Sequence, residues 1–137
     1  MINPFWDKTL TIYTKFYNSD NKKTIWYKYV CNKCFYGLKD VHVLKGIDIA
    51  NENIHIARIP YDSSYLTYRE WCNCEKKQQH LSISVGSIIA VGNLSDDISE
   101  NNSGNELIKK YCDKCFKVST FKENDTFVLK HYYAGGD

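Results

Sequence analysis

All six cysteines of this 137-residue sequence occur as closely spaced pairs. Cys31 and Cys34 form a C-x-x-C motif within the pentad CNKCF, and Cys112 and Cys115 repeat it as CDKCF near the C-terminus. Thiolates are ligands that suit zinc, and two C-x-x-C turns supply the four sulfurs of a tetrahedral site. We therefore predict a structural Zn(II) ion bound by these four cysteines.

The third pair, Cys72 and Cys74, has C-x-C spacing and could replace either C-x-x-C pair as zinc ligands. A site closed by four cysteines has no open coordination position, so its zinc would stabilise the fold rather than catalyse. Two other interpretations stay open. Free cysteines are often small buried hydrophobic residues, and a C-x-x-C motif can be a redox dithiol when its first cysteine begins a helix. Neither pentad precedes a helical pattern, which disfavours the redox interpretation.

The composition is typical of one domain over residues 1–137. Eleven Tyr, six Phe and three Trp favour packed strands over disorder. The 18 basic and 16 acidic residues nearly cancel, which argues against a protein that binds nucleic acid mainly by neutralising phosphates. No nucleotide-binding, hydrolase or metalloprotease motif is present, so we expect no enzymatic activity.

The charges are unevenly spread along the chain. Residues 1–45 hold eight basic residues against three acidic ones, whereas residues 46–108 hold four against nine. Opposite charges on two edges of one domain would suit head-to-tail association of copies, although solvated faces give the same counts.

We expect neither secretion nor membrane insertion. The first residues lack the basic and apolar regions of a signal peptide, and the longest aliphatic run, residues 88–91, is too short to cross a bilayer. A reducing cytoplasm follows from this, and there paired cysteines indicate metal ligands or redox groups.

Period-two alternation of apolar residues predicts a series of short strands. They are residues 9–17, 24–31, 41–49, 54–59, 66–71, 81–92, 116–121 and 127–133. The first two form a long hairpin with a polar tip, Gly37 marks a turn, and residues 50–53 and 122–125 form two more turns. A capping box from Ser103 to Glu106 begins the only expected helix, near 104–111.

This order of elements predicts a mainly β fold, a small antiparallel barrel or sandwich with one long hairpin and one short helix. Residues 94–105 are rich in Asp, Glu, Asn and Ser, so we expect a mobile acidic loop there. We expect a flexible tail at residues 134–137.

Several aromatic residues with interleaved lysines suggest an alternative function, a zinc-stabilised β-barrel that binds single-stranded nucleic acid on a stacking platform. These residues are Trp26, Tyr27, Tyr29, Phe35 and Tyr36, with Lys28 and Lys33. More often such residues belong to the core of a barrel or to an interface.

A set of landmarks in the same order resembles small head-tail connector proteins of tailed bacteriophages that infect Gram-positive bacteria, the minor capsid or head-completion proteins. The landmarks are NPFWDKTLTIY at 3–13, TIWY at 24–27, CFY at 34–36, ARIP at 57–60, VGSIIAVG at 85–92, ELIKKY at 106–111 and LKHY at 129–132. The family pattern keeps a cysteine near Cys34 and does not require the other five, which counts against zinc as a requirement of the whole family.

The resemblance implies a non-enzymatic virion protein, assembled in the cytoplasm of the host bacterium. Such stopper or head-closure subunits form a homo-oligomeric ring below the portal and adaptor, contact tail-side connector proteins, and meet packaged DNA only through the channel. An acidic loop facing that channel would repel DNA and let it slide. On this hypothesis Asp96, Asp97 and Glu100 lie near the channel or a ring interface.

Overall fold

The computed structural model of the chain describes residues 6–45, 48–99, 103–111, 114–124 and 130–136. For residues 39–45, 48–53 and 124 the backbone alone is described.

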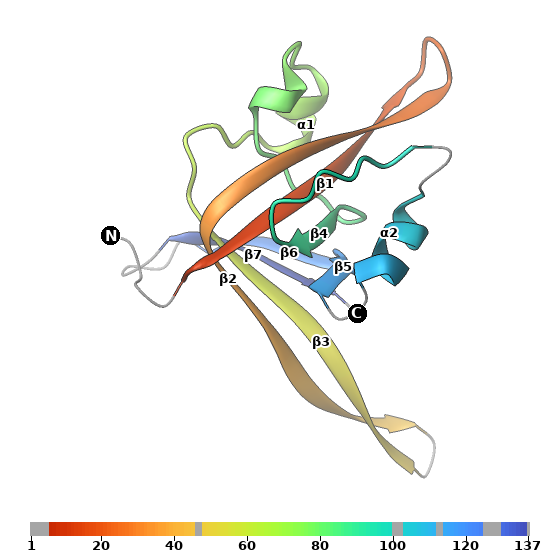
Figure 1. Cartoon of the computed structure of the whole chain (residues 1–137), viewed down its shortest axis with the longest axis vertical. Helices are drawn as coiled ribbons and strands as arrows, with labels where there is room; N and C mark the ends of the chain where they lie inside the picture. Colours follow the sequence, from red (N-terminus) through yellow and green to blue (C-terminus); the bar gives the residue numbers. More distant parts are fainter. Residues whose placement is uncertain (1–5, 46–47, 100–102, 112–113, 125–129, 137) are drawn as a thin grey trace.

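Seven strands, two α-helices and one 3-10 turn make up the described chain (Figure 1). In chain order they are β1 (Lys8–Asn18), β2 (Lys23–Lys45), β3 (Asp48–Pro60), α1 (Tyr68–Cys72), η1 (Lys77–Gln79), β4 (Ile88–Val91), α2 (Gly104–Tyr111), β5 (Cys115–Lys117), β6 (Thr120–Asn124) and β7 (His131–Gly136).

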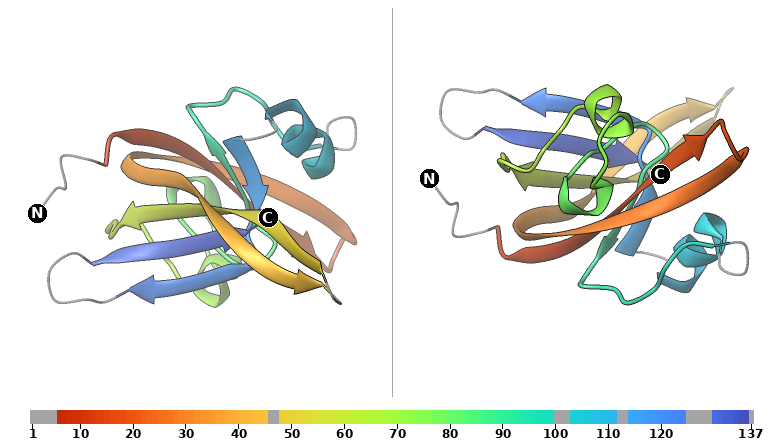
Figure 2. Two further views of the ribbon diagram at one scale, coloured as in Figure 1. Left: turned by 90° about the horizontal axis from the view of Figure 1, so that it is seen from below. Right: turned by 90° about the horizontal axis from the view of Figure 1, so that it is seen from above.

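The strands form one antiparallel sheet in the order β5-β4-β1-β2-β3-β7-β6. The mainly β fold expected from the sequence is thus confirmed. Seen along the long axis, β1 and the first half of β2 lie on one side, and β3, β7 and β6 lie on the other (Figure 2). The two edge strands of the sheet, β5 and β6, follow each other in the chain, so the sheet curls into a partly closed barrel.

β2 belongs to both halves of the barrel because it changes partner midway. Up to Cys34 it pairs with β1, and from Phe35 onward it pairs with β3. At the end of the β1–β2 ladder, Leu10 pairs with Cys31 and Lys8 pairs with Cys34. β1 advances by two residues between these pairs and β2 by three, so β2 has one extra residue there. Lys33 takes a positive φ of 61° there. A β-bulge therefore turns the strand from one half of the barrel into the other.

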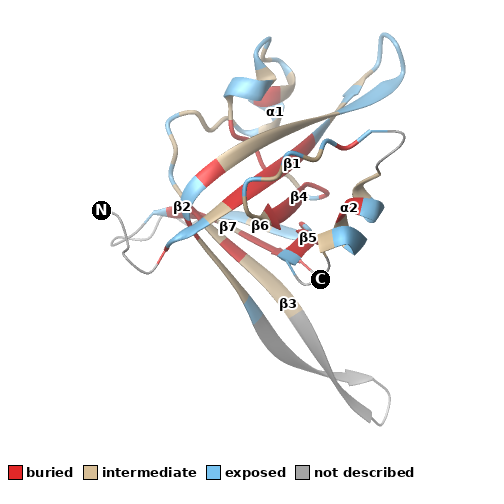
Figure 3. Cartoon of the chain, in the orientation of Figure 1, coloured by how far each residue is buried: buried red, intermediate tan, exposed pale blue. Residues whose placement is uncertain are grey.

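The barrel interior is filled by apolar side chains from β1, β2, β3, β4, β5 and β7, together with Leu81 and Ile83 from the segment before β4. Figure 3 shows these buried positions concentrated on the inner strands, whereas the tip of the β1–β2 hairpin is exposed. The sheet closes where β5 approaches β7, and this seam is tight: Ser119 N, in the link between β5 and β6, donates to Gly135 O of β7 at 2.8 Å. Gly136 packs directly against the backbone of Lys117.

A second apolar layer covers the outer face of the β1–β4–β5 region. Tyr13, Ile88 and Cys115 from the strands pack there against Ile98 and against Leu107 of α2. The helix begins as the sequence predicts, since Ser103 Oγ accepts the Glu106 N–H at 3.2 Å. The side chains of β1 thus point alternately into two cores, one inside the barrel and one under α2.

The second hairpin differs from the sequence prediction. Residues 50–53, expected to be a turn, lie in β3, and Gly37, also expected in a turn, pairs with Ile56 within the ladder. The ladder runs on to the pair Lys45 and Asp48, so the connection falls at residues 46–47. The prediction was wrong because residues 50–53 have the composition of a turn, whereas their pairing with residues 40–43 of β2 keeps them in the strand.

Residues 66–71 were predicted as a strand, and this is also wrong. Thr67 caps α1: its Oγ1 accepts the Glu70 N–H at 3.3 Å, and Glu70 Oε1 accepts the Thr67 N–H at 3.1 Å. This capping box, readable as T-x-x-E, was the overlooked signal. Trp71 anchors α1 on the β1–β2 hairpin, edge-on to Phe16 and Tyr27. The described residues therefore hold two α-helices where one was expected.

The C-terminal part is shifted from its predicted position. Of residues 81–92 only Ile88–Val91 is a strand, and the last two strands are Thr120–Asn124 and His131–Gly136, so the residues 122–124 of the expected turn extend β6. Residues 134–136, expected in a flexible tail, end β7 and are buried. Neither described α-helix has the length and apolar character needed to span a membrane.

The seam predicts a stability difference between two neighbouring glycines. In Gly136→Ala the new Cβ would overlap the carbonyl oxygen of Lys117, so we expect the free energy of unfolding to fall by about 1–3 kcal/mol. Gly135→Ala is the matched control, because its Cβ would meet its nearest neighbours at 3.5 Å, an ordinary contact. Urea unfolding followed by tryptophan fluorescence measures both, and equal stabilities would contradict the close approach.

Candidate functional site

The bulge in β2 brings Cys31 and Cys34 to the same side of the strand. In an unbroken strand, residues three apart point to opposite faces, but the extra residue at the bulge turns both thiols into the barrel core. They are 6% and 0% exposed. The pKa of the Cys31 thiol is raised, first by its hydrogen bond with Cys34 and then by burial. The first C-x-x-C motif is thus a close and buried thiol pair.

Cys115 lies in the other core. It faces α2 with Tyr13 and Ile88, and burial raises the pKa of its thiol to about 12. From β2 the sheet order passes through β1 and β4 before it reaches β5, which is about 14 Å at the usual strand spacing. Cys115 and the Cys31–Cys34 pair therefore occupy different faces of the sheet. Cys112 lies outside the described residues.

Cys72 and Cys74 lie at the end of α1, on the outside of the barrel, and both are half-buried. The Tyr68 hydroxyl donates to the Lys15 carbonyl at 2.8 Å. Burial, followed by interaction with the Cys72 thiol, raises the pKa of Tyr68 to about 12. Among the described residues no group of three or more His, Cys, Asp or Glu side chains is placed to hold a metal ion. Zinc binding by the cysteines remains a prediction from the sequence.

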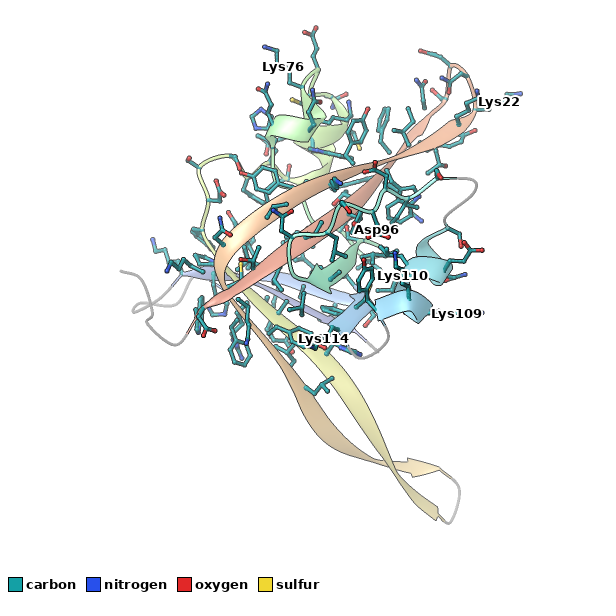
Figure 4. All side chains as sticks on the ribbon, viewed as in Figure 1. Lys22, Lys76, Asp96, Lys109, Lys110 and Lys114 are labelled. Atoms are coloured by element: carbon teal, nitrogen blue, oxygen red, sulfur yellow. The ribbon has the colours of Figure 1, made fainter. Side chains whose placement is uncertain are left out.

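Asp96 is the centre of a polar cluster that fixes the loop before α2. Its carboxylate accepts the Lys110 ammonium at 2.7 Å and the Tyr111 hydroxyl at 2.5 Å (Figure 4). Its backbone carbonyl accepts the Tyr13 hydroxyl at 2.7 Å. These hydrogen bonds, Lys110 first, hold the pKa of Asp96 below its usual range.

The neighbouring acids have different environments. Asp97 pairs with Lys28 at 3.2 Å, yet its side chain remains 79% exposed. Lys28 also donates to the Leu94 and Ser95 carbonyls at 3.3 and 3.1 Å. Residues 94–99, part of the expected mobile loop, are therefore tied to β2 and α2. Glu100 lies outside the described residues, and a role of these acids at a channel or ring interface stays a prediction.

The aromatic residues proposed as a stacking platform do not share one face. Tyr27 packs edge-on against Trp71, and the Tyr29 hydroxyl is 2.7 Å from Ser64 Oγ. Tyr36 bonds to His55 Nδ1 at 2.6 Å. Trp26 alternates with Tyr27 and packs toward the layer beneath α2. Most of this aromatic set therefore belongs to internal packing.

The feature that the sequence prediction missed is an arm formed by β2 and β3. β7 pairs with β3 only over His55–Pro60, and β1 pairs with β2 only up to Cys34. Beyond Leu38, the described ladder joins β2 and β3 to each other alone, as far as Lys45. Figure 1 shows this two-stranded arm projecting from the barrel. Gly46, a turn-favouring residue inside the run 41–49 that was predicted as one strand, was the signal in the sequence.

One protein-family model matches the chain, over residues 5–137, and its description is a family of unknown function. No curated protein matches the sequence. No solved structure matches it either.

The polar cluster predicts a pH-dependent contribution to stability. Because the folded pKa of Asp96 is lowered, its ionised form stabilises the fold above the unfolded pKa of about 3.9, and this contribution is lost as the pH falls through the folded pKa. We expect Asp96→Asn to lower the melting temperature near neutral pH and to match the wild type in acid. Asp97→Asn, at an exposed side chain, is the control, and a difference for Asp96→Asn that persists unchanged in acid would contradict the assignment.

The zinc prediction has its own test. If the first-choice cysteines bind zinc, the reduced protein contains zinc that is lost in Cys31→Ser and kept in Cys72→Ser. The separation of Cys31 and Cys34 from Cys115 in the fold predicts a metal-free protein instead. Metal analysis by mass spectrometry measures this, and a thermal scan with a chelator measures the loss of stability that follows from metal-coupled folding. A metal-free wild-type protein would leave Cys31, Cys34 and Cys115 as buried apolar residues.

Proposed function

Given that this chain belongs to DUF6751, a family of unknown function, we propose that it is a structural virion protein of a tailed bacteriophage. In this proposal it is a head-tail connector subunit of the stopper or head-closure type. Copies form a ring between the portal or adaptor and the tail. The resemblance in the sequence supports this proposal, and the arm formed by β2 and β3 is the structural observation that carries it.

The arm is built as an assembly element. Residues 39–45 of β2 pair with residues 48–54 of β3, and among the described strands neither has another neighbour there. At about 3.3 Å per residue the ribbon extends about 23 Å beyond the barrel. A two-stranded ribbon is marginally stable in water by itself. Its two open edges carry unpaired N–H and C=O groups, which pair readily with another chain.

The barrel supplies a firm base for that arm. β2 and β3 enter the arm from the ladder next to β7, where Ala57 and Ile59 are buried in the barrel core. β2 and β3 therefore run without a break from the arm into the barrel, so a force on the arm acts directly on the core. In a ring, every copy would present its arm at the same level, toward a neighbouring subunit or toward the channel.

The exposed acid next to the ordered loop fits the same proposal. Asp97 lies on the outer surface near α2 and keeps most of its exposure despite its pairing with Lys28. In the ring it is the described acid of the 94–105 loop best placed to face DNA in the channel or a neighbouring subunit. Asp96, by contrast, has an internal structural role through Lys110 and Tyr111.

Removing the arm tests the proposal. In one variant an Asn-Gly turn replaces residues 40–53 and joins the paired residues Lys39 and Ile54. We expect the barrel to fold with its cores intact and ring assembly to be lost, because the partner-binding strands are gone. Electron microscopy of the purified chain, and of particles that carry it, measures the rings, and circular dichroism checks the barrel.

The other hairpin provides the matched control. An Asn-Gly turn in place of residues 18–23 shortens the β1–β2 tip at the pair Tyr17 and Thr24 and leaves the arm unchanged. This variant should assemble as the wild type does. Rings formed equally well without the arm, or particles whose neck lacks the protein, would overturn the proposal.

A further inference from the structure

A groove lies on the outer face of the barrel beyond the area covered by α2. One depression of about 600 Å³ is lined by Lys15, Val85–Gly86 and residues 117–119. A second, of about 170 Å³, is lined by Lys15, Trp26, Ile88, Ser103–Asn105 and Lys117. Both depressions share Lys15 and Lys117, so the two lysines join them into one groove.

The strand register explains why these residues meet. On β1, Lys15 follows Tyr13 on the same face and pairs with Trp26 of β2. Tyr13 lies opposite Ile88 of β4, which in turn lies opposite Lys117 of β5. The apolar part of this face, around Tyr13 and Ile88, is covered by α2 and the loop before it. Lys15, Lys117 and Trp26 lie on the same outer face, outside the area that α2 and its preceding loop cover.

The charge of the groove is not neutralised within the described part of the chain. Lys28 and Lys110, on the covered side, pair with Asp97 and Asp96 at 3.2 and 2.7 Å. Neither Lys15 nor Lys117 has an acidic residue within ion-pair distance among the described residues, and no acid lines either depression. Two exposed ammonium groups therefore flank one groove without a counter-charge.

The walls of the groove are shaped by close packing. Gly86, in the turn over Ser84–Ser87, has a φ of 100°, and a Cβ there would lie 3.7 Å from Lys15 Nζ, so the ammonium rests against this turn. On the other side Gly104 begins α2 so close to Ile88 that a Cβ would collide with it. Trp26 is half-buried and forms one wall of the smaller depression.

We propose that this groove binds a phosphate group of a nucleic-acid strand, with the phosphate between Lys15 and Lys117 and an adjacent base against Trp26. Lysine ammonium groups neutralise phosphates as point charges, and aromatic rings stack on bases without regard to sequence. The hydroxyl of Ser103 on the wall adds a donor for a phosphate oxygen. The proposal does not depend on ring formation.

Binding of a labelled oligothymidylate to the full chain, followed by fluorescence anisotropy over a range of salt concentrations, tests this groove. A length of about twelve nucleotides spans one barrel. For Lys15→Ala/Lys117→Ala we expect binding to weaken by about tenfold at low salt and the salt slope to fall by about 0.7, the value for one phosphate of a single strand that is no longer neutralised. Trp26→Phe should retain the salt slope and bind more weakly.

Lys109→Ala/Lys114→Ala is the matched control, because it removes two exposed lysines elsewhere (Figure 4). It should change binding by less than about twofold. An equal loss in both double variants, or no binding by the wild type, would overturn the proposal.

Two competitors identify the source of the anion. Inorganic phosphate that binds the wild type as tightly as the oligothymidylate does, and fails to bind Lys15→Ala/Lys117→Ala, would keep the phosphate site and remove nucleic acid as its source. An oligoglutamate peptide that binds more tightly than the oligothymidylate would overturn the proposal in favour of an acidic protein segment.

Discussion

The change of partner within β2 is the constraint on which the rest of the structure depends. A single strand of 23 residues pairs with β1 through Cys34 and with β3 from Phe35 onward, and the bulge between the ladders turns it by placing one extra residue on β2. Holding Lys33 in the left-handed region costs about 1–2 kcal/mol. Burial of Cys31 and Cys34 inside the turn offsets that cost.

The same strand therefore belongs to the barrel and to the arm. Its first half completes the β1 side of the core, and its second half leaves the barrel with β3 after the ladder with β7 ends. The arm is therefore connected to the packed interior by the backbones of β2 and β3 and by the hydrogen bonds of these strands to their neighbours in the barrel. In the proposed connector, the ring interface and the stability of each barrel are consequently linked, and the seam at Gly136 joins β7 to β5 of the same sheet.

Local sequence signals predicted the elements whose stability is local. The alternation of β1 and the capping box at Ser103 gave correct assignments, and so did the mainly β class. The prediction of a strand at 66–71 was wrong because aromatic content outweighed the capping residues Thr67 and Glu70. The extra residue at Lys33 and the length of the arm were beyond reach, since both depend on which strands pair at long range. Two identical cysteine motifs suggested one shared site, yet register places Cys31 and Cys115 on opposite faces of the sheet.

The folded arrangement also changes the meaning of the charge blocks. The basic N-terminal segment and the acidic middle segment partly cancel each other within one molecule, because Lys28 of the first pairs with Asp97 of the second. Asp96 is likewise matched by Lys110. After these pairings, Lys15 and Lys117 remain as two positive charges on a groove whose described lining holds no acid. A near-neutral chain can therefore carry a specific anion site, because the local field depends on which charges the fold pairs and not on their sum.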